Sequence, residues 1–401
     1  MILILGVASA ILLGFLAVVS AYQWVFALLS LLAKHSTFKR TGDGRAKFLI
    51  LIPAHNEETA LPHTLASIAA LRYSKDLVEV VVIADRCTDS TRQVAEEAGA
   101  TCFERNDDSG VKGAAIAWGI RETSRNSYQF DALVVLDADT RVDAMLLDAF
   151  SAGISRGYRV QQAFNYLSNP WETAFTRIIA VTSILKNGLF YAGKSSVGLS
   201  AMLQGTGMCM DRAIVEQYEW NAFSVGEDWE FSVSLLLAGE TIHFNPDAMI
   251  YATESSGVSQ ASRQRLRWAT GRYAVTGTGA LHLIKKGLEQ RSGRLLDAAA
   301  TLLCPNYSTQ ASLALLCCVV SWYLSRHEEW MWLLTVSISI LCSMAAFFVL
   351  GVLKTESPLR AIAGIPFMLI FLPWRLGIEV LGLLGFGRKK WGRSARESST
   401  R

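Results

Sequence analysis

The sequence contains few of the patterns that assign a chain to a disulfide-bonded, zinc-binding or dinucleotide-binding class. Its seven cysteines are odd in number and scattered, with no C-x-x-C pair. We therefore expect neither a disulfide framework nor a zinc site, and a reducing compartment is favoured. No G-x-G-x-x-G follows the first strand-like run, so the dinucleotide-binding fingerprint is missing. The chain also has no internal repeat and no low-complexity segment.

Charge is scarce for a soluble enzyme but too plentiful for a pure bundle of membrane helices. Charged residues make up 18% of the chain and hydrophobic residues 51%, with a mean hydropathy of +0.28. This mixture predicts a soluble domain joined to membrane segments. The net charge is only +3, and Lys and Arg do not gather on one stretch of the middle region, so no nucleic-acid partner is expected.

The first apolar run, residues 1–33, contains no charged side chain. A membrane-spanning helix needs about 20 apolar residues, whereas a signal peptide, the competing interpretation, has a shorter apolar core after a basic start. We therefore predict an uncleaved N-terminal anchor. By the positive-inside rule, the basic residues that follow hold the next domain in the cytoplasm and leave the N-terminus outside. These residues are Lys34, Lys39, Arg40, Arg45 and Lys47.

The last third of the chain contains two more charge-free runs, residues 301–325 and 330–353. Each is long enough to cross a bilayer. We therefore predict two transmembrane helices within residues 296–354. The short charged segment 326–329 between them is expected to be an external turn.

A shorter apolar run follows within residues 355–387, and it is interrupted by Arg375 and Glu379. Its length favours an interfacial or re-entrant helix. Residues 388–401 form a basic tail that is expected on the cytoplasmic side. A third full span in this region is the alternative, and the sequence leaves it open.

Residues 34–295 are predicted to form one cytoplasmic domain of alternating strands and helices. The alternation indicates an α/β fold with a doubly wound, mostly parallel sheet. Such sheets bind ligands at the carboxyl ends of their strands. The expected strands are 48–52, 78–84, 101–104 and 133–136, and the expected helices are 57–71, 88–98 and 112–123.

Two carboxylates, Asp137 and Asp139, follow the strand expected at 133–136. Because side chains alternate along a strand, the two point the same way. Paired carboxylates suit a hard cation, and Mg²⁺ in proteins usually takes one or two carboxylates together with substrate phosphates. A nucleotide-diphosphate substrate would complete that shell. The alternative is a turn, since Asp is common where strands end.

Seven short stretches extend this interpretation, and they occur in the order IPAHNEE, ADRCTDST, KG at 112–113, LDADT, GTGM, GEDWE and QRLRW. Together they resemble the family-two glycosyltransferases of the GT-A fold. The likeness is greatest to membrane-embedded enzymes, namely the cellulose, hyaluronan, chitin-oligosaccharide and poly-N-acetylglucosamine synthases. The resemblance covers roughly residues 47–275 and the general plan of flanking membrane helices.

The resemblance implies a role for each matching residue. Asp228 would be the general base, and Asp139 would bind a Mg²⁺ or Mn²⁺ ion that bridges the donor diphosphate. The implied substrate-binding residues are Asp85 at the uridine, Lys112 and Asp137 at the nucleotide, and Gln264, Arg267 and Trp268 of the Q-x-x-R-W stretch. Within that stretch Arg267 would lie near the diphosphate and Trp268 would line the acceptor site.

Two of these motifs have structural alternatives. Ser224 to Glu227 fits a capping box for a helix from Phe231 onward, in which case Glu227 and Asp228 only favour the helix N-terminus. The arginines of the Q-x-x-R-W region could instead form a basic interfacial helix near anionic lipid; they are Arg263, Arg265, Arg267 and Arg272. Against this, Gln264, Arg267 and Trp268 share one helix face, whereas Arg265 points elsewhere.

The pattern as a whole predicts a multi-pass protein of the cell membrane. Its cytoplasmic domain would be a metal-dependent, inverting hexosyl or N-acetylhexosaminyl transferase. We expect it to move a sugar from a UDP-sugar to a growing β-linked glycan, either an exopolysaccharide or a chitin-like oligosaccharide, among membrane lipids. Two or three later spans make a thin channel wall, so an export partner or a homo-oligomer is a further expectation. The alternatives are transfer to a lipid carrier or ceramide-like lipid, and a non-catalytic subunit of an export complex.

Overall fold

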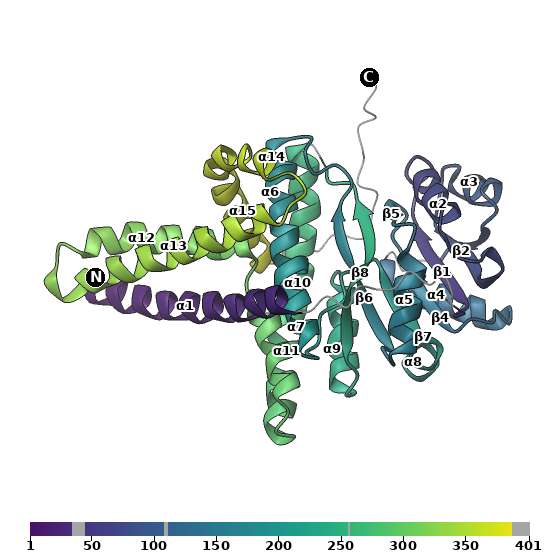
Figure 1. Ribbon diagram of the computed structural model, residues 1–401, viewed down its shortest axis with the longest axis horizontal. Coiled ribbons are helices and arrows are strands. Elements are labelled where there is room, and N and C mark those ends of the chain that lie inside the picture. Colours follow the sequence, from purple (N-terminus) through teal and green to yellow (C-terminus); the bar gives the residue numbers. More distant parts are fainter. Residues whose placement is uncertain (34–44, 108–110, 256, 387–401) are drawn as a thin grey trace.

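The computed structural model describes residues 1–33, 45–107, 111–255 and 257–386. A mixed sheet with its helices forms one end of the molecule, and a bundle of long helices projects from the other (Figure 1). The basic tail predicted at 388–401 lies outside the described residues, as do Lys34, Lys39 and Arg40.

The sheet of the described residues has eight strands in the order β3-β2-β1-β4-β7-β6-β8-β5. Four neighbouring pairs are parallel and three, β4–β7, β6–β7 and β5–β8, are antiparallel. The predicted α/β class with a mostly parallel sheet is therefore confirmed. The strands are β1 (Phe48–Ala54), β2 (Val78–Asp85), β3 (Thr101–Arg105), β4 (Ala132–Val135), β5 (Thr140–Val142), β6 (Val160–Leu167), β7 (Met208–Asp211) and β8 (Ile242–Ala252).

Apolar residues cover both faces of the sheet, as expected for parallel strands between helices. In β1, Leu49 and Leu51 belong to one buried cluster, and Phe48, Ile50 and Ile52 belong to the other. The helices of this half are α2 (Leu61–Ala69), η1 (Lys75–Leu77), α3 (Thr91–Glu97), α4 (Lys112–Arg125), α5 (Leu146–Ser155), α6 (Ala174–Ser183), η2 (Ile184–Tyr191), α7 (Ala192–Ser196), α8 (Arg212–Gln217), α9 (Glu227–Leu237), α10 (Val258–Glu289) and α11 (Gly293–Leu303).

The first helix of the domain is shorter than the predicted 57–71, because the residues at its expected start form hydrogen bonds with a neighbouring loop. The backbone N–H of Glu57 donates to the Thr91 hydroxyl at 2.8 Å, and that of Glu58 donates to Asp89 at 3.2 Å. These bonds join the loop after β1 to the loop after β2. The helix therefore begins at Leu61, with a proline in its first turn, where the missing N–H costs nothing.

Four described helical segments are long and apolar enough to cross a membrane: Ile2–Leu32, Tyr307–Leu324, Glu328–Leu353 and Pro358–Leu383. They comprise α1 (Ile2–Leu32), α12 (Tyr307–Leu324), η3 (Glu328–Trp330) with α13 (Met331–Leu353), and α14 (Pro358–Ile362), η4 (Ile365–Phe367) and α15 (Met368–Leu383). By length and composition, the segment predicted as interfacial thus qualifies as a span as well.

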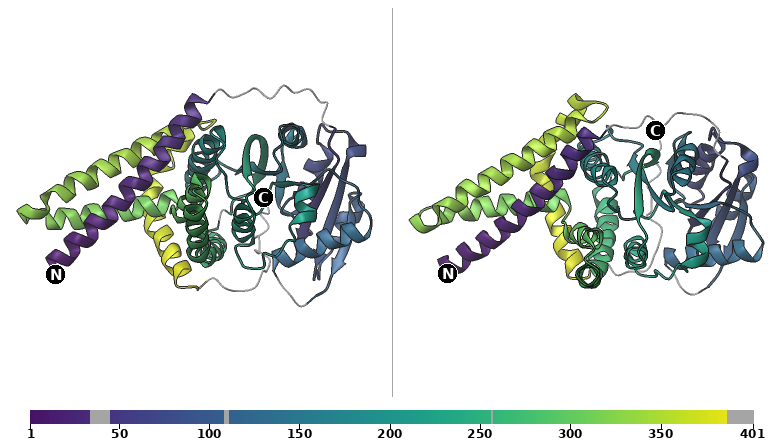
Figure 2. Two further views of the ribbon diagram at one scale, coloured as in Figure 1. Left: turned by 90° about the horizontal axis from the view of Figure 1, so that it is seen from below. Right: turned by 60° about the horizontal axis from the view of Figure 1, so that its bottom comes forward.

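The arrangement separates α15 from the other three candidates. Helices α1, α12 and α13 pack together and project from the sheet domain, whereas α15 lies beside α10 at the base of this bundle (Figures 1 and 2). Gly382 of α15 packs against Ala269 of α10 so closely that a Cβ at Gly382 would lie 2.6 Å from the Ala269 Cβ. Helix α10 therefore contacts both the membrane-type helices and the sheet domain.

Candidate active site

The loop at Gly205–Met208 braces the end of β4, where the predicted carboxylate pair lies. Thr206 accepts a hydrogen bond from the Asp137 backbone N–H at 3.0 Å. Gly205 and Gly207 adopt positive φ angles of 81° and 65°, which glycine adopts without steric cost. Asp137 and Asp139 are each half-buried. The GTGM stretch is thus a structural partner of the D-x-D motif.

Lys112, at the start of α4, joins this loop to the carboxylates. Its Nζ lies 2.6 Å from Asp137 Oδ1 and 3.5 Å from Glu227 Oε1, and it donates to the Gly205 carbonyl oxygen at 2.7 Å. Burial alone would lower the pKa of Lys112, but the charges of Asp137 and Glu227 outweigh it and raise the pKa above its usual value. The ammonium therefore stays charged at neutral pH.

Asp228 lies close to the same loop. A Cβ built at Gly205 would be 3.4 Å from Lys112 Nζ and 3.5 Å from Asp228 Oδ2. Burial, reinforced by the neighbouring charge of Glu227, raises the pKa of Asp228 to about 7. A carboxylate with that pKa can accept a proton near neutral pH, as a general base must.

The capping-box alternative for this segment is wrong. Helix α9 begins at Glu227 with Gly226 as its N-cap residue, and it has no side-chain cap. Ser224 lies two residues before the N-cap position, and its Oγ accepts from the Gly226 N–H at 3.3 Å. Glu227 is instead part of the charged cluster around Lys112.

The Q-x-x-R-W stretch lies on α10, close to the start of α9. Gly271 of α10 packs against Gly226, and a Cβ at Gly271 would lie 2.8 Å from the Gly226 backbone N. Gln264 and Arg267 are half-buried, whereas Trp268 is 47% exposed. Their predicted substrate contacts stay predictions.

The basic-helix alternative for this region does not hold for all four arginines. Arg265 is buried, pairs with Glu254 at 2.9 Å and stacks on Phe175 at 5.2 Å. Arg272 donates to the Cys304 carbonyl oxygen at 2.5 Å and lies over the Trp229 ring. Since two of the four are committed to protein partners, the set is not one lipid-facing stripe.

Asp85 ends β2 as predicted, but it is fully buried. One oxygen is bound by Arg105, and the other lies 2.8 Å from Arg86 Nη2. Contact with a nucleotide base would require the exposed part of Arg86 to move. The predicted uridine role of Asp85 therefore stays a prediction.

A divalent cation fits these residues only if a ligand supplies most of its shell. The described residues contain no group of three or more His, Cys, Asp and Glu side chains that could hold a metal. A site formed by Asp139 alone, or by Asp137 and Asp139 together, suits a Mg²⁺ or Mn²⁺ ion that is also bound by phosphate oxygens and water. That donor set matches a nucleotide diphosphate.

Sequence reasoning missed Lys186, which lies on η2 near Asp228. Its Nζ donates to Gln204 Oε1 at 2.7 Å. Protein groups around the ammonium lower the pKa of Lys186 to about 8 by desolvation, with the charge of Asp228 opposing the shift, although the residue as a whole is exposed. The available signal was a single lysine within the apolar run 178–193.

A second feature of this region is a phosphate-loop sequence motif that does not adopt the phosphate-loop structure. Residues 188–195 read GLFYAGKS, which fits the phosphate-loop pattern G-x-x-x-x-G-K-S. The stretch is helical, however, and Lys194 is fully buried and paired with Asp297 at 2.8 Å. A phosphate loop requires a strand, an open loop and a free lysine, so these residues do not form one.

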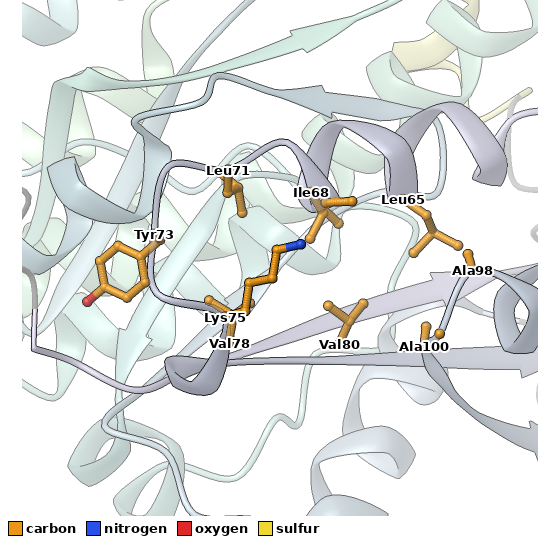
Figure 3. A pocket seen from close by; sticks show the side chains of 11 residues that line it. Leu65, Ile68, Leu71, Tyr73, Lys75, Val78, Val80, Ala98 and Ala100 are labelled. Carbon is orange, nitrogen blue, oxygen red and sulfur yellow. The ribbon is translucent and has the colours of Figure 1, made fainter.

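An apolar hollow of about 180 Å³ lies apart from this cluster, between α2 and β2 (Figure 3). Leu65, Ile68 and Val80 line it, and the Lys75 side chain extends across it. The hollow has none of the carboxylates of the candidate site, so it does not compete as the catalytic centre.

The comparison with protein families decides the class of this site. Residues 45–271 match the family model described as glycosyltransferase-like family 2. The chain belongs to this family. The match spans more than half of the chain and includes every site residue discussed above, apart from Arg272. The predicted family-two membership is thus confirmed.

Two curated relatives each match more than half of this family-two glycosyltransferase. It is 28% identical over 240 residues to the protein named "Probable glycosyltransferase YdaM" of Bacillus subtilis, covering 57% of this chain and 56% of that protein. It is 24% identical over 238 residues to the poly-β-1,6-N-acetyl-D-glucosamine synthase of Staphylococcus aureus, covering 56% and 54%. The matches thus span about half the length of these relatives.

The fold of the whole chain is similar to that of a solved mannosyltransferase. The structure of that enzyme from Pyrobaculum calidifontis, in complex with GDP-Man and Mn²⁺, matches with a TM-score of 0.56 at 16% identity. The match covers 95% of this chain and 97% of the mannosyltransferase. The predicted GT-A architecture is therefore confirmed.

Proposed function

We propose that this family-two glycosyltransferase transfers a sugar from a UDP-sugar to a β-linked glycan at the inner face of the cell membrane. The observation that carries the proposal is the cluster around Gly205, where Lys112, Asp137 and Asp228 meet. The paired cation Lys112 and strand-end carboxylate Asp137 suit the nucleotide, and the nearby carboxylate Asp228, with its raised pKa, suits the acceptor.

The reaction can be written in terms of these side chains. The acceptor hydroxyl gives its proton to Asp228 while its oxygen attacks C1 of the donor sugar. The bond between C1 and the diphosphate oxygen breaks on the opposite side, and UDP leaves with the electron pair. One displacement inverts the anomeric centre, so an α-linked donor gives a β-linked product. One base suffices because no sugar leaving group needs a proton.

The leaving diphosphate gains negative charge, and several groups are available to oppose it. Lys112 stays protonated at the nucleotide side, and charge-assisted hydrogen bonds from such groups are strong. We assign Arg267 to the same task. A divalent cation held by Asp139 would supply further charge neutralisation when bound.

The membrane arrangement supports a cytoplasmic site. The α12–α13 turn packs against the N-terminal end of α1, since a Cβ at Gly6 would lie 2.5 Å from the Trp330 ring. Both therefore lie at the end of the bundle far from the sheet domain (Figure 1). The basic residues Arg45 and Lys47 lie at the start of the sheet domain. By the positive-inside rule, the side of the membrane that carries the sheet domain is therefore expected to be the cytoplasmic one.

The experiment measures UDP release by the purified full-length protein with a panel of UDP-sugars. We expect release with at least one donor, dependent on Mn²⁺ or Mg²⁺ and abolished by EDTA. Product masses separate the acceptor classes, since a polymerase gives a ladder and a lipid transferase a single product. No release with any donor would instead support a binding subunit, and release that survives EDTA would contradict the metal assignment.

A further inference from the structure

Helix η2 presents one accessible cation from an otherwise buried segment. Its π-helical turn spans Ile184–Tyr191, and such turns are rare and frequently occur at functional sites. Leu185 and Asn187 are buried, whereas Lys186 between them is exposed. Lys186 takes no part in the buried apolar clusters through which η2 packs, which instead contain Leu185, Leu189 and Phe190.

The ammonium of Lys186 is held in place by a chain of amides. Lys186 donates to Gln204 Oε1 at 2.7 Å, and Gln204 Nε2 donates to Asn187 Oδ1 at 3.0 Å. The backbone N–H of Gln204 donates to Gln162 Oε1 at 2.9 Å. Hydrogen bonds therefore hold both the backbone and the side-chain amide of Gln204, and this amide in turn orients the Lys186 ammonium.

Lys186 retains capacity to bind a ligand. An ammonium has three N–H donors, of which Gln204 accepts one. In the part of the chain that the structure describes, no carboxylate oxygen lies within 4.0 Å of Lys186 Nζ. By contrast, Lys112 is bound by two carboxylates and a carbonyl oxygen.

The location of Lys186 assigns it to the acceptor rather than the nucleotide. Gln204 directly precedes Gly205, whose Cβ position is close to both Lys112 Nζ and Asp228 Oδ2. Lys112 pairs with Asp137 after β4, whereas Lys186 and Asp228 each shift the pKa of the other and η2 packs on the bundle helices α1 and α13. Lys186 is thus near the proposed base Asp228, on an element that packs against the membrane-type helices, and the described ion pairs of Asp137 do not include it.

We propose that Lys186 is an acceptor-binding residue whose free N–H groups donate to an acceptor sugar oxygen next to the attacking hydroxyl. The proposal rests on the proposed transferase function. Asp228 still takes the proton of the attacking hydroxyl, and Lys186 transfers none. Its part is to fix the sugar ring so that one hydroxyl faces both the base and C1 of the donor.

The test measures KM values for donor and acceptor separately, with UDP-GlcNAc as donor and chitotetraose as acceptor probe. In the full-length protein, Lys186→Met should raise the chitotetraose KM at least about tenfold, the factor that 1.4 kcal/mol represents. The UDP-GlcNAc KM and the slow hydrolysis of UDP-GlcNAc by water should stay within about twofold of wild type. Lys186→Arg should recover part of the loss, and the exposed Lys285→Met should behave as wild type.

The alternative outcomes separate this proposal from the proposed function. An unchanged acceptor KM in Lys186→Met, or an equal rise in the donor KM, would overturn the acceptor role. Hydrolysis of UDP-GlcNAc without any transfer to chitotetraose by the wild type would overturn it as well. A wild type that releases UDP from no donor would refute the transferase function itself. Thermal melting shows whether each variant folds, and Gln204→Leu, expected to raise the acceptor KM less, provides a second variant.

Discussion

Asp228 has the surroundings that a base needs at neutral pH. Most aspartates are ionised far below pH 7, and their conjugate bases are too weak to take a proton from a hydroxyl efficiently. Enclosure at the start of α9, next to Glu227, raises the pKa of Asp228 to about 7. Lys112 and Lys186 oppose this shift, so the carboxylate remains available as a base.

The first prediction concerns pH. Because only the ionised carboxylate can act as base, kcat/KM should fall about tenfold per pH unit below an apparent pKa near 7. Asp228→Asn should lower kcat by about 10²–10⁴-fold and leave UDP binding unchanged, because we propose Lys112, and not Asp228, as a nucleotide contact. UDP release across pH 5–9 and UDP titration check both. A flat wild-type profile between pH 5 and 7 would exclude Asp228 as the base.

The second prediction concerns Asp139. Asp139→Asn removes a carboxylate charge from the proposed cation site, so the Mn²⁺ concentration for half-maximal activity should rise at least about tenfold. This concentration is measured by following UDP release while Mn²⁺ is titrated. The matched control is the exposed Asp76→Asn on η1, which should titrate as wild type. Equal Mn²⁺ dependence in both variants would mean that Asp139 does not bind the cation.

At the scale of elements, the approach of α9 to α10 aligns the base with the Q-x-x-R-W helix. Gly226 and Gly271 make that approach possible because neither has a Cβ. Any side chain at Gly271 would separate the two backbones. Asp228 and Arg267 lie within one or two turns of this contact, so both would move.

The third prediction is therefore that Gly271→Ala destabilises the fold by about 1–3 kcal/mol and lowers activity more than binding of UDP. Displacement by about 1 Å can cost about 100-fold in rate. Gly277→Ala, on the same helix with no atom within 4 Å of its Cβ position, should be neutral or gain up to about 1 kcal/mol. Thermal melting and UDP release check the pair, and equal behaviour of the two variants would show that the contact is unimportant.

Much of this arrangement was predictable at the scale of elements and little at the scale of contacts. The apolar runs predicted β1, β2 and β4 within two residues, and the strand-end rule placed Asp137 correctly. The capping box at Ser224 failed because local spacing cannot show that Glu227 pairs with Lys112, which is 115 residues away. Lys186 was missed because an isolated lysine has no motif, and only the folded chain brings it to Gln204.

At the scale of the whole molecule, the protein combines a catalytic domain with a three-helix bundle and one helix at their junction. Helix α15 lies beside α10 (Figure 2), and its charged residues Arg375 and Glu379 are buried and paired with each other at 2.5 Å. Charged residues inside a bilayer are usually paired and face the protein, so this pair fits a span as well as a membrane surface, and the interfacial position of α15 stays a prediction.

The fourth prediction concerns topology. In a cysteine-free background that remains active, His327→Cys in the α12–α13 turn should react with a membrane-impermeant maleimide in intact cells. Lys285→Cys, exposed on α10, should react only after the cells are opened. The reverse pattern would place the sheet domain outside, where UDP-sugars are absent, and would contradict the proposed function.

The most direct test of the account is a structure of the full-length protein with UDP and Mn²⁺, using anomalous scattering to locate manganese. We predict one manganese peak beside Asp139, bridged to the diphosphate, with Lys112 at the nucleotide and Asp228 facing the open side where the sugar would lie. A manganese or UDP position away from Asp139, or an Asp228 carboxylate that opens into a different pocket, would contradict it.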